Sequence, residues 1–328
     1  MSSAMNNRAF NLSVKPGGVP YSPLALTPGQ DLKGYVFSKL GKATLFLMTC
    51  SSVFSVLLIF FFVIRESLIF FEQESLWSAI TTHEWYPKSE NPRHGMLALL
   101  AGSVYVTLAS LFFSVPVGIM AAVFLSDLVS FKVRAVVKPV IEILAAIPSV
   151  AYGFFAVLVL APWMQDHWGF STGTNALNAS IILSIMALPT IISVAEDSIS
   201  SLGPELREAS YGLGATRFET LFKVVIPAAH SGIIAAVILG MMRAIGETMV
   251  VWMASGNASQ IPTPWWDLTQ SVRTMTATIA GEMGETEHGS IHYGALFAVG
   301  VYLLIITFSL NLVSECFLAR AKKAMGKT

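Results

Sequence analysis

The sequence predicts an all-α membrane protein with six transmembrane helices. Of its 328 residues, 54% are hydrophobic and only 12% are charged, whereas soluble domains carry about 25% charged residues. Apolar runs long enough to cross a bilayer recur six times, because a helix needs about 20 residues to span the hydrocarbon layer. The mean hydropathy of +0.65 agrees with this class of protein.

The six expected spans leave only short polar connections between them. They cover residues 43–64, 97–125, 139–160, 177–195, 231–255 and 294–317. Pro148 and Pro189 are expected to kink the third and fourth spans, because proline removes a backbone donor. The segment 1–42, which contains several Gly and Pro residues, is expected to be a mobile tail. Residues 43–317 then form one membrane domain, followed by a basic end at 318–328.

The basic residues predict the orientation of these spans. Fifteen of the twenty lysines and arginines fall in the tail, in the loops after spans two and four, and at the C-terminal end. The alternate loops hold four, and the remaining one, Arg243, lies inside span five. Cytoplasmic loops carry the excess of Lys and Arg. We therefore expect both termini of this multi-pass membrane protein in the cytoplasm.

Composition and motifs exclude several classes of function. Equal numbers of basic and acidic residues give no general affinity for nucleic acid. All six histidines fall in loops or at the edge of a span, without an HExxH pattern, so an intramembrane hydrolase would lack its metal or base. The two cysteines show no metal-ligand spacing. No metal site is expected, and no phosphate-binding loop for ATP is present in this chain.

The cytoplasmic loop 196–230 is long and carries its own helix signals. Pro204 and Glu205 are typical of a first helical turn. Glycines at 212 and 214 then predict a turn, and Thr216 and Glu219 have the spacing of a capping box at a second helix start. Pro227 is expected to close that helix before span five. The sequence thus predicts a helical hairpin, which could equally be an amphipathic segment on the bilayer surface.

One stretch of this loop resembles a known family. The run EASYGLGATRFETLFKVVIP, residues 208–227, is similar to the EAA loop of ATP-binding-cassette importer permeases. Glu208, Ala209, Gly214 and Pro227 match that pattern by type and spacing. In that family the loop docks on the ATPase subunit. The resemblance implies a type I importer permease fold, and an ATPase coupling role for Glu208, Ala209, Gly214, Thr216, Glu219 and Pro227.

Span five carries two charges where charges are costly. Arg243 lies near the expected bilayer midplane, and Glu247, four residues later, would project from the same helix face. A charge at that depth costs at least about 2.5 kcal/mol, so neither side chain can face lipid. One interpretation is a structural ion pair that locks span five. The other is an anion gate in which Glu247 orients the arginine until an anion arrives.

Two further stretches sharpen the resemblance. Residues 239–257, LGMMRAIGETMVVWMASGN, and 142–162, EILAAIPSVAYGFFAVLVLAP, look like the PstC-type permeases of bacterial phosphate importers. That resemblance implies phosphate translocation at Arg243 and Glu247. It also implies a PstA-like permease partner, two PstB-like ATPase chains that bind ATP and Mg, and a periplasmic PstS-like phosphate-binding protein. An ion-coupled secondary transporter of an anion is the alternative, and the coupling loop distinguishes the two.

Overall fold

The structure, a computed structural model, describes residues 28–324 and divides into two units. The first unit ends at Ile59, and its described part is a stretch of α1. The second unit begins at Phe60 and holds the remaining elements. Residues 1–27 of the expected tail 1–42 lie outside the described residues.

Helix α1, Pro28–Phe71, begins well before the expected first span. Residues 28–42, which were expected in the tail, are helical instead. Pro28 occupies the first helical position, where its missing N–H costs no hydrogen bond. A helix that has nucleated in a long apolar stretch extends with one hydrogen bond for each added residue. Polar composition before residue 43 was therefore a poor guide to where the helix starts.

The core of the second unit is formed by α3, Leu97–Val123, α7, Ala176–Ser200, and α10, Ile226–Ile245. Their interfaces use small residues. A Cβ at Gly118 of α3 would lie 2.7 Å from Ile191 Cγ2, and one at Gly240 of α10 would lie 2.6 Å from Ile191 Cγ1. Ile191 of α7 is thus held between two glycines, as is common where membrane helices pack closely. Pro189 lies inside α7 without interrupting it.

The expected third span is broken rather than kinked. It consists of α4, Phe131–Ala145, and then α5, Ser149–Phe155, the π-helical turn η2, Ala156–Leu160, and α6, Ala161–Trp168. The two parts meet at an angle of 84°. Pro148 explains the break, because proline lacks the N–H that the helix needs and disfavours helical backbone at the preceding residue.

The expected fifth span is also interrupted. Helix α10 ends at Ile245, residues 246–248 leave the helix, and α11 covers only Met249–Ala254. Two bonds satisfy polar groups at the break: Thr276 Oγ1 donates to Glu247 O at 2.8 Å, and Thr248 N donates to Glu247 Oε1 at 3.1 Å. A long loop then leads to α12, Met275–Glu282, and the short turn η4, Met283–Glu285.

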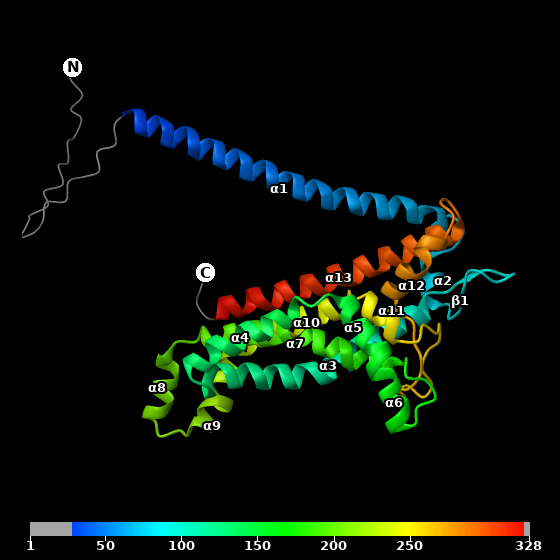
Figure 1. Cartoon of the computed structure of the whole chain (residues 1–328). Helices are drawn as coiled ribbons and strands as arrows, with labels where there is room; N and C mark the ends of the chain where they lie inside the picture. The colour runs from blue at the N-terminus through cyan, green and yellow to red at the C-terminus, as the bar shows by residue number, and fades with distance from the viewer. Residues whose placement is uncertain (1–27, 325–328) are drawn as a thin grey trace, which may run out of the picture. The chain divides into compact units, whose positions relative to one another are not determined.

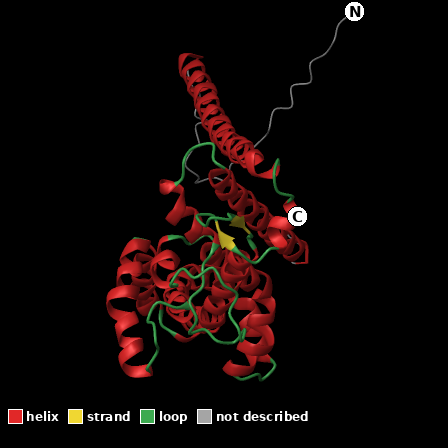
Figure 2. Cartoon of the chain, turned by 90° about the vertical axis from the view of Figure 1, so that its right-hand side faces the viewer, coloured by secondary structure: helices red, strands yellow, loops and turns green. Residues whose placement is uncertain are grey.

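Five helices of the described chain are long and apolar enough to span a membrane, and the bent pair can make a sixth. The last is α13, Ile291–Ala324, which packs against α10 and α12. A small hairpin of β1, Trp85–Tyr86, and β2, Arg93–His94, follows α2, Leu76–Thr81. Figure 1 places this hairpin and α12 at one end of the second unit and α8 and α9 at the other. Figure 2 shows that helices dominate the chain.

Candidate functional site

The loop predicted as a coupling segment folds as a helical hairpin. Its first helix is α8, Pro204–Gly212, and its second begins with α9, Arg217–Thr220. Gly214 between them has φ +85°, and a Cβ placed there would meet nothing within 4 Å. Glycine is therefore favoured by the left-handed backbone and not by lack of space. The glycine turn and the two helix starts of the hairpin lie where the sequence predicted them.

The predicted capping box is present at the start of α9. Glu219 N donates to Thr216 Oγ1 at 3.3 Å, and Thr216 N donates to Glu219 Oε2 at 3.1 Å. The reciprocal bonds satisfy two otherwise free backbone donors and fix the turn after Gly214.

Pro227 does not close the second helix, contrary to expectation. The helix continues from Arg217 to Ile245 through a π-helical turn, η3, Leu221–Val225. Pro227 falls within the first two positions of α10, just after that turn. A π-helical turn shifts the backbone pairing to five residues, so a missing donor is tolerated there. The hairpin is consequently joined to span five by continuous helix.

Two polar contacts tie the hairpin together and to α3. Ser210 and Thr220, both buried, join their hydroxyls at 2.8 Å between α8 and α9. Arg207 donates from Nε and Nη2 to the carboxylate of Asp127, in the π-helical turn η1, Phe124–Leu128, that ends α3. Sequence reasoning missed Asp127, whose partner lies far along the chain. The hairpin is thus attached to α3 as well as to α10.

The outer face of the hairpin is apolar and open. Leu213 is 90% exposed, and Phe218 and Phe222 are exposed with ring centroids 4.5 Å apart. Glu208 and Ala209 are also exposed. A cavity of about 1020 Å³ lies between the hairpin and the end of α3 and is lined by Asp127, Arg207, Phe218 and Phe222 among others. The hairpin therefore leaves large apolar side chains exposed.

Arg243 lies at the place where the two broken spans meet. It sits in the last turn of α10, and its Nη2 lies 3.5 Å from the carbonyl oxygen of Ala145, the last residue of α4. Helix α5 packs against α11 just beyond. The guanidinium is exposed, and the described residues offer it no carboxylate within ion-pair distance. An unpaired cation at a helix break can receive an anion.

Glu247 does not pair with Arg243, so that part of the prediction is wrong. The prediction assumed a continuous helix, in which residues four apart share a face. Helix α10 instead ends at Ile245, and the carboxylate of Glu247 accepts the backbone N–H of Thr248. Glu247 lies beside a small polar cavity with Ser103 and Thr276, hydroxyl groups that sequence reasoning did not single out.

A buried acid at the same end of the second unit as the hairpin was also missed. Glu196, at 0% exposure, pairs with Arg134 and with Lys138, whose Nζ lies 2.8 Å from Glu196 Oε2. Both cations belong to α4, so the cluster joins α4 to α7. In the sequence, this acid follows the expected fourth span, and the loop before the third span is basic. Counting Lys and Arg residues uses such a loop only to orient the spans, so the ion pair was not predicted.

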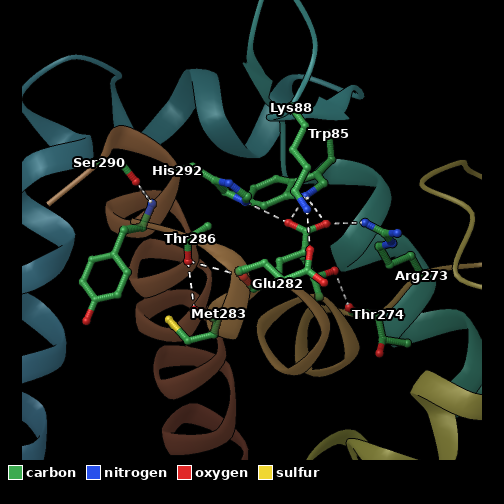
Figure 3. A network of polar contacts seen from close by, with 12 residues as sticks. Trp85, Lys88, Arg273, Thr274, Glu282, Met283, Thr286, Ser290 and His292 are labelled. Carbon is green, nitrogen blue, oxygen red and sulfur yellow. Dashed lines mark hydrogen bonds and ion pairs between the residues drawn. The ribbon is translucent and has the colours of Figure 1, made fainter. Parts of the chain in front are cut away.

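A second polar network lies at the opposite end, beneath the β hairpin. Figure 3 shows Trp85, Arg273 and His292 around Glu282. Glu282 accepts from Trp85 Nε1 at 3.0 Å, from Arg273 Nη1 at 2.6 Å and contacts His292 Nε2 at 2.9 Å. Within the described residues, no group of three or more His, Cys, Asp and Glu side chains could hold a metal ion.

Comparison with known proteins decides the family. The model for "Binding-protein-dependent transport system inner membrane component" matches residues 114–323. The chain belongs to this family. The matched range contains both the helical hairpin and Arg243, so the resemblance to PstC-type permeases is confirmed for the region that carries the candidate sites.

Similar proteins of this family come from several bacteria. A probable ABC transporter permease, YqgH, of Bacillus subtilis is 39% identical over 243 residues, which cover 74% of this chain and 78% of YqgH. The phosphate transport system permease protein PstC of Mesorhizobium japonicum is 34% identical, over 76% of this chain and 80% of the relative. PstC of Haemophilus influenzae is 30% identical, with 74% and 81% covered.

Solved structures agree on the fold. A bacterial ABC transporter for the acidic polysaccharide alginate matches with a TM-score of 0.57 and 16% identity, covering 87% of this chain and 99% of that one. The inward-facing MetNI methionine transporter matches with a TM-score of 0.53 and 19% identity, over 70% and 99%. The fold is that of type I ABC importer permeases, which form the path through the membrane and are not themselves enzymes.

Membership of this family also fixes the general setting of the protein. It is an embedded component of the inner membrane, and it works with an ATPase and a substrate-binding protein. The expectation of an ion-coupled secondary transporter is not favoured, because the family depends on a separate binding protein and ATPase.

Proposed function

We propose that this chain is the permease subunit through which an ATP-driven importer moves inorganic phosphate across the cytoplasmic membrane. Relatives of similar length are PstC permeases of phosphate transport systems. By the same reasoning, the chain pairs with a homologous PstA-like permease and two PstB-like ATPases, which bind ATP and Mg. A PstS-like protein delivers phosphate from the periplasm.

The observation that carries this proposal is the position of Arg243. Its guanidinium stands at the junction of two broken spans, with the carbonyl oxygen of Ala145 as its hydrogen-bond partner and no carboxylate within ion-pair distance in the described chain. A guanidinium offers a planar fork of donors that fits a phosphate. The unpaired state therefore favours a translocation role over a structural ion pair.

The coupling hairpin supplies the mechanical connection in this proposal. Its exposed apolar residues, Leu213, Phe218 and Phe222, provide the surface that docks on the ATPase. Because α9 continues through η3 into α10, a displacement of the hairpin reaches Arg243 along one helix. ATP binding draws the ATPases together, and ATP hydrolysis returns the path to its inward-facing state. Only a difference in ATP affinity between the two states can drive the cycle.

The proposed orientation places the hairpin and both termini in the cytoplasm. The basic cluster of Arg134, Lys138 and Arg207 lies on the hairpin side of the second unit, in agreement with the excess of cations on cytoplasmic loops. The β hairpin, α12 and the loop 255–274 then face the periplasm, from which the binding protein approaches. Reagents that modify the hairpin in intact cells without crossing the membrane would contradict this orientation.

The experiment that tests the function is phosphate uptake by the Arg243→Gln variant of the assembled importer. We expect uptake to fall to the level of a strain without the permease, while the subunits still copurify. Lys132→Gln is the matched control, since it removes an exposed cation on α4. Normal phosphate uptake by Arg243→Gln, or uptake without any ATPase partner, would overturn the proposal.

A further inference from the structure

The end of the second unit opposite the coupling hairpin contains a separate polar cavity. It has a volume of about 500 Å³ and lies between the β hairpin and the loop that follows α11. Lys88, Asn257, Ser259, Arg273 and Glu282 are among its lining residues. We call it the outer cavity. None of the residues that match the coupling motif lines it.

Arg273 is held in place by its neighbours but keeps free donors. Its Nε donates to Asn257 O at 2.9 Å, and its Nη1 donates to Glu282 Oε1 at 2.6 Å. An arginine has five N–H donors. The three others have no hydrogen-bond partner in the described part of the chain. The Glu282 carboxylate therefore orients the guanidinium and leaves these three donors free. The Arg273 side chain is 25% exposed.

The carboxylate of Glu282 already has partners for both of its oxygens. Glu282 accepts from Trp85 and Arg273 and contacts His292, which together occupy both of its oxygens. Lys88 extends over the same cavity from the β hairpin, and Figure 3 shows its side chain reaching toward Glu282. Lys88 forms an ion pair with Glu285, and the two side chains are 60% and 65% exposed. Such surface pairs contribute little and exchange readily. Arg273 keeps free N–H donors beside Glu282, and Lys88 can exchange Glu285 for an anion, so both side chains can bind one.

Asn257 adds an acceptor that has no partner. Asn257 Nδ2 donates to Trp252 O at 2.6 Å, which fixes the orientation of the amide. Its Oδ1 is buried and has no hydrogen-bond partner among the described residues. Leaving a buried acceptor unpaired is costly. An oxyanion that still carries a proton would donate to this oxygen, whereas a fully deprotonated one would repel it.

The outer cavity continues inward. A second cavity of about 100 Å³ shares Asn257, Arg273 and Glu282 with it and extends to Trp252 of α11 and Thr278 of α12. Helix α11 follows the break after Ile245, and Thr276 of α12 donates to Glu247 O within that break. Arg273 therefore stands between the outside and the region of the membrane in which Arg243 lies.

We propose that the outer cavity is a receiving site for a protonated oxyanion, in which Arg273 and Lys88 bind the charge and Asn257 Oδ1 accepts the proton. Inorganic phosphate at neutral pH has this chemistry, and sulfate does not. The site would take the anion before it reaches Arg243. The identity of the anion rests on the proposed function, but the existence of the site does not.

The test measures access to the cavity in the complete transporter, in spheroplasts freed of binding protein. Cys50 and Cys316 are replaced by serine, and Ser89→Cys places a thiol at the rim. A membrane-impermeant maleimide then labels this thiol from outside. We expect inorganic phosphate to slow the labelling, and sulfate to do so only at roughly tenfold higher concentration. Gln73→Cys, exposed between α1 and α2, is the control that phosphate should not protect.

The Arg273→Gln variant should raise the phosphate concentration for half-protection roughly tenfold or more, the effect of losing a charged hydrogen bond. Arg273→Lys keeps the charge and should show a smaller loss, which guards against a fold defect in the glutamine variant. Protection that is unchanged in both variants would overturn the proposal, and equal protection by sulfate would overturn the role of Asn257.

This outcome can be separated from that of the proposed function. The Arg243→Gln variant should lose uptake and retain phosphate protection of the thiol at position 89. If Arg243→Gln transports normally while protection persists, the proposed translocation role fails and the outer site stands. If protection is absent in the parent protein while uptake depends on Arg243, the outer site fails alone.

Discussion

Arg207 on α8 donates hydrogen bonds to both carboxylate oxygens of Asp127 at the end of α3, at 2.6 Å from Nε and 3.3 Å from Nη2. The same guanidinium also donates to the carbonyl oxygens of Leu202 and Ile199 at the end of α7. One side chain thus joins the coupling hairpin to two core helices. This contact and the continuous helix into α10 are two routes by which a force on the hairpin can reach the membrane helices.

Replacing Arg207 with alanine should loosen the hairpin without removing its docking surface. We expect a loss of about 1–3 kcal/mol in the free energy of unfolding, because a part-buried carboxylate loses charged hydrogen bonds. ATPase subunits should still copurify, while substrate-stimulated ATP hydrolysis falls. Thermal unfolding and ATPase assays of the assembled importer measure the two effects. Full stimulation in Arg207→Ala would mean that α10 alone transmits the motion.

Gly214→Ala and Gly203→Ala form a matched pair in the same loop. Neither new Cβ would meet an atom within 4 Å, but only Gly214 has a positive φ, +85°. We expect Gly214→Ala to cost about 1–2 kcal/mol in backbone strain and to weaken ATPase coupling. Gly203→Ala should be close to neutral. Identical transport and stability in the two variants would show that the turn tolerates another backbone.

Glu196→Gln should destabilise the protein far more than its neighbour Asp197→Asn. Glu196 is fully buried between Arg134 and Lys138, whereas the Asp197 side chain is 66% exposed. Removing one partner of a buried ion pair typically costs about 3–5 kcal/mol, because the remaining charge is left without compensation. Thermal unfolding of the purified variants in detergent measures the difference. Equal melting temperatures would mean that water reaches Glu196.

Acidification should destabilise the β hairpin through His94. Burial lowers the pKa of this histidine below its ordinary value of 6.5, and the nearby His292 lowers it further, against the opposing charges of Glu74 and Glu282. The folded state therefore binds its proton less readily than the unfolded state does. The contribution of neutral His94 to stability is complete above pH 6.5 and declines as the pH falls toward the depressed pKa.

The measurement is the melting temperature at pH 7.5 and pH 5.5. We expect the parent protein to lose stability on acidification, and His94→Leu to lose less, since leucine cannot titrate. His83→Leu, which removes an exposed histidine, should behave like the parent. If His94→Leu showed the same pH dependence as the parent, another group would have to be responsible.

The sequence alone determined what depends on neighbours along the chain. Apolar runs predicted the membrane helices, and the spacing of Thr216 and Glu219 predicted the hairpin, because burial in lipid and helix capping act over a few residues. Only the structure showed the break after Ile245, which separates Arg243 from Glu247 and leaves the arginine without a carboxylate partner. It also decided that Arg207 meets Asp127 and that Trp85 meets Glu282. These contacts join residues 80 and 197 positions apart, so only the packing of whole helices could bring them together.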